Sequence, residues 1–188
     1  MELHDEKTII PILGKPMIEY VIEAVKGSKV NQVIVATSPS TPKTSNLLKK
    51  FDLEIFETAG EGYHEDLSQI LKKFDLEIIL IISGDFPLIS SKVIDRIITF
   101  HEKSKKPSLS VMVRVEDFKK FNLKPTYIMD YQDQKLVPVG INIIDGRKNT
   151  KEWQEEALMI VSEPQFLINV NTKKDLEMVE KILVESKK

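Results

Sequence analysis

The chain has 188 residues, of which 41% are hydrophobic and 30% are charged, and its net charge at pH 7 is −2. This length suits one domain, residues 1–188, with a full hydrophobic core, and the small net charge argues against broad electrostatic binding to nucleic acid or to a membrane. Cysteine is absent, which excludes disulfides and thiolate metal sites. No apolar run could span a membrane or act as a signal peptide, so we expect a cytoplasmic protein.

The first half of the chain alternates between apolar runs and segments with helical spacing of apolar residues. A polar start, Met1–Lys7, and a short apolar run, Thr8–Leu13, come first. The expected elements that follow are, in order, a helix from Met17 that Gly27 ends, a strand at Val30–Thr37, a helix at Lys43–Lys50, a strand at Leu53–Phe56, a helix at His64–Phe74, a strand at Glu77–Ser83 and a helix at Ser90–Lys103. This alternation predicts right-handed crossovers and an α/β fold with a doubly wound, mostly parallel sheet, as in Rossmann-like proteins.

The second half is less regular, and we expect it to form an antiparallel part of the sheet. Its expected elements are a strand at Ser108–Val115, a helical turn at Val115–Phe121, short strands within Pro125–Val139, strands at Gly140–Asp145 and Leu158–Val161, an apolar segment at Phe166–Val170 and a terminal helix at Lys173–Glu185. Thr172 precedes this last helix and Asp175 follows three residues later, which is a weak capping box.

The stretch Glu77–Ile89 contains the junction that matters most for function. Its unbroken aliphatic run, Ile78–Ile82, predicts a strand buried on both faces, as in parallel sheets. Such a strand ends at the carboxyl edge of the sheet, where open α/β folds bind their ligands. Gly84 allows close approach of the backbone there, and Asp85 could hold a divalent cation against a phosphate, although an acidic residue at this point could also simply cap a turn.

The loop before the third expected helix offers a second candidate. The Gly60–Gly62 segment could bring backbone amides to a base or a phosphate, but a flexible turn is the simpler interpretation. His64, Glu65 and Asp66 resemble a metal cluster, yet acidic residues at the start of a helix more often complement the helix dipole, and we favour that reading.

Polar side chains near the two ends of the chain complete the set of candidates. Asn169 and Asn171 occupy alternate positions of an extended segment and therefore share one side of it. Their carboxamides could orient a substrate or a metal-bound water, or could be ordinary polar groups at a strand end. Lys7 and Lys15 could neutralise phosphate oxygens as point charges, although most lysines in such a chain are solvated.

Taken together, several blocks of the sequence resemble the nucleoside-triphosphate transferase superfamily and, within it, the archaeal GTP:adenosylcobinamide-phosphate guanylyltransferases. The blocks keep the family's order and span nearly the whole chain. They are Lys7–Tyr20 (KTIIPILGKPMIEY), Ala36–Thr44 (ATSPSTPKT), Gly60–Leu67 (GEGYHEDL), Val137–Asn142 (VPVGIN) and Ile168–Leu176 (INVNTKKDL). The T-S-P-x-T-P-K-T block is the most specific, whereas G-D-x-P-L and N-x-N-T-x-x-D-L also occur in similar form in molybdenum cofactor guanylyltransferases.

The resemblance implies a metal-dependent nucleotidyl transfer that belongs to cobalamin biosynthesis. GMP would pass from GTP to adenosylcobinamide phosphate, a phosphorylated small-molecule acceptor, and pyrophosphate would leave. Asp85 would hold Mg²⁺, and Lys7 corresponds to the signature lysine expected near the phosphates. Catalysis would then depend on positioning and electrostatics, which explains why the sequence shows no activated nucleophile.

The resemblance also assigns roles to individual residues, and it leads us to expect that the protein forms a homodimer. The catalytic group would be Lys7, Asp85 and Asn171. The residues expected to bind the nucleotide are Thr37, Ser38, Pro39, Gly60, Gly62, Asp66 and Gly84. Those expected to bind the acceptor are Gly140, Asn142 and Asn169.

The chain departs from the family at its start. The family opens with a hydrophobic strand and a loop of the form G-G-x-G-T-R-M that clasps the triphosphate, and this sequence has neither, with Met1 where the loop's last Met would stand. A smaller change is Thr8, which replaces the Pro that follows the signature lysine. We expect the native protein to begin upstream of Met1. The first strand is central in a doubly wound sheet, so the strands at Val30–Thr37 and Glu77–Ser83 would lose a ladder partner or close up against each other.

Two alternatives remain open. A molybdenum cofactor guanylyltransferase would share the chemistry but not the acceptor, and the T-S-P-x-T-P-K-T block disfavours it. A truncated, non-catalytic nucleotide-binding paralogue is favoured by the missing Gly-rich loop.

Overall fold

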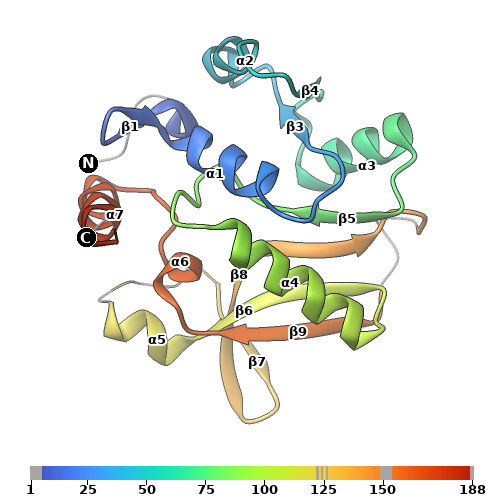
Figure 1. Cartoon of the computed structure of the whole chain (residues 1–188). Helices are drawn as coiled ribbons and strands as arrows, with labels where there is room; N and C mark the ends of the chain where they lie inside the picture. The colour runs from blue at the N-terminus through green and yellow to red at the C-terminus, as the bar shows by residue number, and fades with distance from the viewer. Residues whose placement is uncertain (1–5, 122, 124, 126, 149–153, 187–188) are drawn as a thin grey trace.

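The computed structural model describes residues 6–121, 123, 125, 127–148 and 154–186 (Figure 1). Its described strands form a five-stranded sheet and two separate two-stranded sheets, and helices pack around them. The helices are a short 3-10 helix η1 (Lys7–Ile9), α1 (Met17–Lys26), α2 (Pro42–Leu48), α3 (Tyr63–Phe74), α4 (Ser91–Ser104), α5 (Val115–Lys120), α6 (Pro164–Leu167) and α7 (Lys173–Glu185). The strands are β1 (Pro11–Ile12), β2 (Lys15–Pro16), β3 (Ile34–Thr37), β4 (Glu54–Glu57), β5 (Ile78–Ile81), β6 (Ser108–Arg114), β7 (Met129–Tyr131), β8 (Gln134–Asp145) and β9 (Glu156–Val161).

The larger sheet has the strand order β5-β8-β6-β9, and β7 pairs with β8. β5, β6 and β7 are each antiparallel to β8, whereas β9 is parallel to β6. β5, β6, β7 and β9 therefore all run in one direction, and β8 alone runs against them. This confirms the predicted α/β fold with mostly parallel strands and an antiparallel part in the later half of the chain.

β3 and β4 form a second, two-stranded parallel sheet, and no ladder joins β3 to β5 among the described residues. The hydrophobic core is divided in the same way. A large cluster lies over the main sheet, and a small one joins Ile18 and Ile22 of α1 to Leu48 of α2. Among the described strands, none pairs with both β3 and β5.

The prediction that the Glu77–Ser83 strand is buried on both faces is wrong. Ile78 is 50% exposed, and Ile79–Ile82 are only half-buried. The ladder to β8 covers one edge of β5, and the other edge has no partner strand among the described residues. An aliphatic strand is fully buried only where neighbours cover it on both edges and both faces, and β5 lacks one of these neighbours.

Other elements differ from prediction mainly in their limits. The strand expected at Val30–Thr37 begins only at Ile34, and Gly140–Asp145 is the second half of a single strand, β8, rather than a separate one. The apolar segment at Phe166–Val170 begins within a one-turn helix, α6. The terminal helix and its capping box are confirmed, since Thr172 and Asp175 exchange both of the expected hydrogen bonds.

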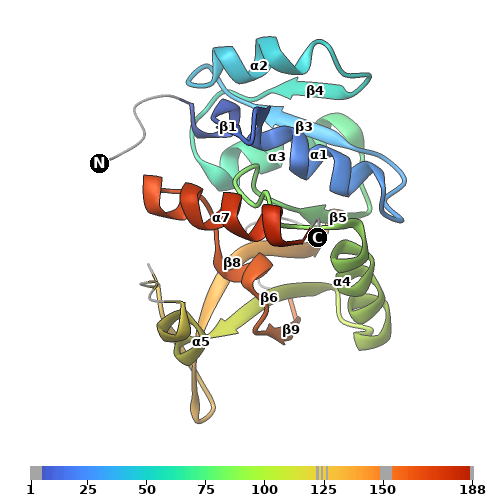
Figure 2. The same cartoon turned by 60° about the vertical axis from the view of Figure 1, so that its left-hand side comes forward.

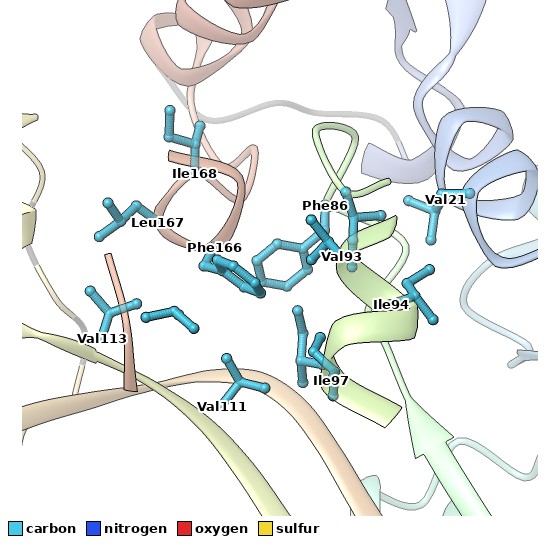
Figure 3. Packing of buried hydrophobic residues seen from close by; sticks show 14 of the residues in the cluster. Val21, Phe86, Val93, Ile94, Ile97, Val111, Val113, Phe166, Leu167 and Ile168 are labelled. Atoms are coloured by element: carbon cyan, nitrogen blue, oxygen red, sulfur yellow. The ribbon is translucent and has the colours of Figure 1, made fainter. Parts of the chain in front are cut away.

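The main core forms where α4, α6 and the loop after β5 meet the large sheet (Figure 3). Val93, Ile94 and Ile97 of α4 are buried, as their helical spacing predicts. Phe166 is 1% exposed and lies beside Phe86 in this cluster. None of the described helices is long and apolar enough to cross a membrane.

Candidate functional site

Three side chains from distant parts of the chain meet beyond the carboxyl end of β5. Lys7 Nζ donates a hydrogen bond to Asp85 Oδ2 (3.0 Å) and another to Asn171 Oδ1 (2.6 Å). The structure thus brings together the three residues predicted to be catalytic. The ammonium group is partly exposed and lies between an anionic and a neutral oxygen, where an incoming phosphate could also contact it.

Asp85 has a carboxylate oxygen that remains available for a cation. The residue is 8% exposed, and its Oδ1 atom is buried without a hydrogen-bond partner among the described residues. A buried carboxylate oxygen is costly to leave unpaired, so a bound cation would stabilise it. Mg²⁺ is usually held by one or two carboxylates together with substrate phosphates, and this donor therefore fits it.

The backbone around Asn171 is held firmly in place. Val170 N donates to the carbonyl oxygen of Asp85 (3.1 Å), which ties this segment to the loop after β5. Asp175 Oδ2 accepts from the backbone N–H groups of Asn171 (3.0 Å) and Thr172 (2.7 Å) at the start of α7. The capping box therefore also positions the residue that contacts Lys7.

Replacing Thr172 by Ala is expected to lower the free energy of unfolding by about 1 kcal/mol, because the Asp175 N–H at the start of α7 loses its acceptor. Urea unfolding measures the change, and Thr172→Ser serves as a control because it keeps the hydroxyl. Equal stability of Thr172→Ala and the parent would show that the capping box contributes nothing.

Glu6 attaches the η1 segment to the start of α2. Its carboxylate accepts from the backbone N–H groups of Lys43 (2.8 Å) and Thr44 (2.7 Å) and from the Thr44 hydroxyl (2.6 Å). Burial alone would raise the pKa of Glu6, but the hydrogen bonds from Thr44 and Lys43 outweigh burial and lower it. Thr8 is bonded to Thr44 as well, through a contact of 2.7 Å between hydroxyls.

Gly84 is needed where η1 crosses the loop after β5. A Cβ atom on Gly84 would lie 3.0 Å from Thr8 Cγ2 and 3.6 Å from Ile18 Cδ1. The small residue thus permits Lys7 and Asp85 to approach each other. Lys15 takes no part in this cluster, because it pairs with Glu23 and lies 4.3 Å from the centre of the Tyr20 ring.

The two loops predicted to bind the nucleotide lie close together. A Cβ atom on Gly60 would lie 3.4 Å from Pro39 Cδ and 3.5 Å from Ser38 Cβ. Thr37, which ends β3, is 5% exposed, and its hydroxyl oxygen lacks a partner among the described residues. A buried hydroxyl of this kind can bind a polar group of a ligand.

The loop that begins at Gly60 wraps around Asp66. Asp66 Oδ1 accepts from Gly60 N (3.0 Å) and Glu61 N (3.3 Å), and Asp66 N donates to the carbonyl oxygen of Gly62 (2.9 Å). Gly60 and Gly62 have φ angles of +72° and +131°, which side chains other than glycine's rarely allow. Asp66 therefore organises this loop, and the hydrogen bonds that its Oδ1 accepts come from loop amides before α3 rather than from the first N–H groups of the helix.

Of the residues predicted to bind the acceptor, Gly140 and Asn142 both belong to β8, and Asn169 precedes Val170, whose N–H bonds to the Asp85 carbonyl oxygen. Asn142 lies opposite Ile81 in the sheet, where it accepts from Ser110 Oγ (2.9 Å) and bonds to the Tyr63 side chain. It lines a cavity of about 240 Å³ between α3 and the sheet. Gly140 has a φ of +77° at an irregularity in the β6–β8 ladder, which is typical of a bulge, and Asn169 is exposed.

Sequence reasoning missed the structural roles of Glu6, Thr44 and Tyr63. Burial raises the pKa of the Tyr63 phenol, and the hydrogen bond with Asn142 opposes that effect. All three residues act through partners more than 30 residues away in the chain, so no local pattern could have identified them.

Comparisons with known proteins place these features in a family. A family model described as cytidylyltransferase matches residues 5–184. The adenosylcobinamide-phosphate guanylyltransferase of Methanocaldococcus jannaschii is 33% identical over 188 aligned residues, which cover 95% of this chain and 89% of that protein. The bifunctional protein GlmU of Acholeplasma laidlawii is 31% identical over 59% of this chain, but the match covers only 25% of that protein.

Solved structures share the fold. CMP:2-keto-3-deoxy-manno-octonic acid synthetase complexed with CTP has a TM-score of 0.73 and 17% identity, and the match covers 96% of this chain and 92% of that one. Molybdopterin-guanine dinucleotide biosynthesis protein A from Archaeoglobus fulgidus has a TM-score of 0.64 and 16% identity, with coverage of 96% and 91%. At such low identities, the likeness establishes the fold and not the activity.

Proposed function

This chain belongs to the cytidylyltransferase family and to the family of the Methanocaldococcus jannaschii adenosylcobinamide-phosphate guanylyltransferase, and from that premise we propose that it transfers GMP from GTP to adenosylcobinamide phosphate. The observation that carries the proposal is the cluster of Lys7, Asp85 and Asn171, in which a buried carboxylate oxygen lacks a partner among the described residues. A cation and the phosphates of a nucleotide would complete this cluster.

In the proposed reaction, a phosphate oxygen of the acceptor forms a bond to the α-phosphorus of GTP, and the bond to the pyrophosphate oxygen breaks. Asp85 would hold Mg²⁺, and the bound cation would offset the negative charge that develops on the phosphates. The Lys7 ammonium group neutralises phosphate oxygens, and Asn171 orients it through the 2.6 Å hydrogen bond. The chain contributes position and charge, so no side chain needs to act as a nucleophile.

The test is incubation of the purified chain with GTP labelled at the α-phosphate, with and without Mg²⁺ and with each acceptor in turn. We expect label to enter adenosylcobinamide phosphate and pyrophosphate to appear, only when Mg²⁺ is present. Transfer to molybdopterin instead would favour the molybdenum cofactor alternative. Binding of GTP without transfer to either acceptor would favour a non-catalytic nucleotide-binding protein.

We expect guanine to be preferred over adenine. Gly60 lies close to Pro39, so the two loops expected to bind the nucleotide are neighbours, and the buried Thr37 hydroxyl lies at the start of one of them. A site that hydrogen-bonds one base leaves polar groups unpaired with another, so the preference should be at least about a hundredfold. Competition titrations of GTP binding with ATP measure the preference, and equal competition by the two nucleotides would contradict it.

A homodimer is also proposed, on family resemblance alone. Sedimentation of the purified chain over a tenfold range of concentration tests it.

A further inference from the structure

The η1 segment, which carries Lys7, depends on its neighbours for its position. η1 is a single 3-10 turn without a buried residue, and such a turn has little stability of its own. Figure 2 shows the dark blue segment that contains it between α2 above and α7 below. The contacts of η1 with neighbouring segments therefore decide where the Lys7 ammonium group lies.

The residues on both sides of Lys7 are bonded to one residue of α2, Thr44. Before Lys7, Glu6 accepts from the Thr44 backbone N–H (2.7 Å) and from the Thr44 hydroxyl (2.6 Å). After Lys7, the Thr8 hydroxyl lies 2.7 Å from the Thr44 hydroxyl, and Thr8 must donate there because the one Thr44 hydroxyl proton goes to Glu6. Thr44 is only 3% exposed, so water competes little for these bonds. η1 is thus fixed to α2 at two points that flank Lys7.

Glu6 also completes the start of α2. The N-cap residue, Thr41, makes no capping hydrogen bond with its side chain. The Glu6 carboxylate accepts instead from the backbone N–H groups of Lys43 and Thr44, which lie in the first turn and have no acceptor within the helix. A residue that is distant in the chain therefore holds the first turn of α2.

The same turn is joined to one of the loops expected to bind the nucleotide, Ser38–Thr41. Thr41 N donates to the carbonyl oxygen of Ser38 (2.9 Å), and the Thr41 hydroxyl accepts from Ser38 N (3.1 Å). Within α2, Ser45 N donates to the carbonyl oxygen of Thr41 (3.0 Å). Glu6 and Thr44 thus connect this loop to η1, so a displacement of one segment displaces the other.

We propose that Glu6 and Thr44 are positioning residues of the nucleotide site, which hold the Lys7 ammonium group at a fixed place relative to the Ser38–Thr41 loop so that one nucleotide can meet both. They act through the backbone of η1 rather than on the reacting atoms. The inference rests on the part of the proposed function in which Lys7 meets the phosphates of a nucleotide. A capping role alone would stabilise α2 without affecting the Lys7 side chain, and this difference separates the two roles.

The first test measures the reactivity of the Lys7 amine, which requires neither nucleotide nor turnover. The purified chain is treated with an acetylating succinimidyl ester, and mass spectrometry follows the modification of each lysine. Thr44→Val keeps the shape of the side chain but removes the hydroxyl. We expect Lys7 to be acetylated at least about fivefold faster in this variant, because its ammonium group is held less firmly by its two partners. Lys135, whose Nζ lies 2.9 Å from Asp130 Oδ1, is the internal control and should not change.

Three further variants separate positioning from loss of stability. Glu6→Gln should act in the same direction as Thr44→Val, because the amide has only one oxygen that can accept. Thr44→Ser keeps the hydroxyl and should restore the parent rate at Lys7. Ser108→Ala removes the hydroxyl of a residue that is 6% exposed and that donates to the carbonyl oxygen of Glu155 (3.2 Å). Although this control also loses a hydrogen bond, Lys7 should react as in the parent. Circular dichroism checks that each variant is folded.

The second test determines whether Thr44 acts through Lys7 when a nucleotide binds. The dissociation constant of GTP–Mg²⁺ is measured for the parent, Thr44→Val, Lys7→Ala and the double variant. We expect Thr44→Val to weaken binding about fivefold in the parent but less than about twofold when the Lys7 side chain is already absent. Two residues that acted independently would show the same weakening in both backgrounds.

Three results would overturn the proposal. One is equal acetylation of Lys7 in the parent, Thr44→Val and Glu6→Gln, and another is a rise at Lys135 as large as that at Lys7. The third is equal weakening of GTP–Mg²⁺ binding by Thr44→Val in both backgrounds. Failure of the parent to transfer GMP would overturn only the proposed transfer, because neither test measures it.

Discussion

Replacing Asp85 by Asn is expected to lower GMP transfer by about a thousandfold while leaving the fold intact. The carboxamide keeps the size of the side chain but removes the negative charge from Oδ1, the buried oxygen proposed to hold Mg²⁺. The hydrogen bond from Val170 N to the Asp85 backbone carbonyl is unaffected. The transfer assay measures the rate, and a titration of Mg²⁺ in the presence of GTP measures cation binding separately from turnover.

Asp117 provides a matched control for this substitution. Like Asp85, Asp117 is buried, with 3% of its surface exposed, and it pairs with a lysine: Lys120 Nζ lies 2.5 Å from Asp117 Oδ1. Its other carboxylate oxygen, Oδ2, has no partner among the described residues. It belongs to α5, well away from η1 in Figure 1. We expect Asp117→Asn to retain transfer near the parent rate. Parental activity and unchanged Mg²⁺ dependence in Asp85→Asn would show that the metal assignment is wrong.

Replacing Phe166 by Ala is expected to lower the free energy of unfolding by about 3–5 kcal/mol. Its ring is buried beside Phe86 in the core shown in Figure 3, and the guanidinium of Arg96 lies 5.5 Å from the ring centre. α6 has only one turn, so its attachment to the rest of the fold depends on the packing of its two buried residues, Phe166 and Leu167. Urea unfolding of the parent and the variant measures the loss.

Phe100 of α4 is the control for this prediction, because it is 39% exposed. Phe100→Ala is expected to cost about 1 kcal/mol or less, since little buried area is lost. Equal losses for the two variants would show that the cluster around Phe166 is not the principal core.

Much of the secondary structure was predictable because its causes are local. The apolar residues of α4 recur at helical spacing, and Thr172 and Asp175 satisfy the first N–H groups of α7 from within one turn. The position of Asp85 was also predictable, because a strand followed by Gly84 delivers the next residue to the carboxyl edge of the sheet. The limits of β3 and the presence of α6 were not, since hydrogen bonding at the ends of elements depends on their surroundings.

The sequence by itself therefore determined the α/β class, the order of its elements and the position of Asp85 beyond the carboxyl end of β5. Only the tertiary structure decided that Asn171 meets Lys7 across 164 positions of the chain and that Glu6 holds the start of α2. It also decided that the aliphatic residues of β5 stay half-exposed. The reason is that propensity and periodicity act over a few residues, whereas burial and ligand geometry depend on which distant segments become neighbours.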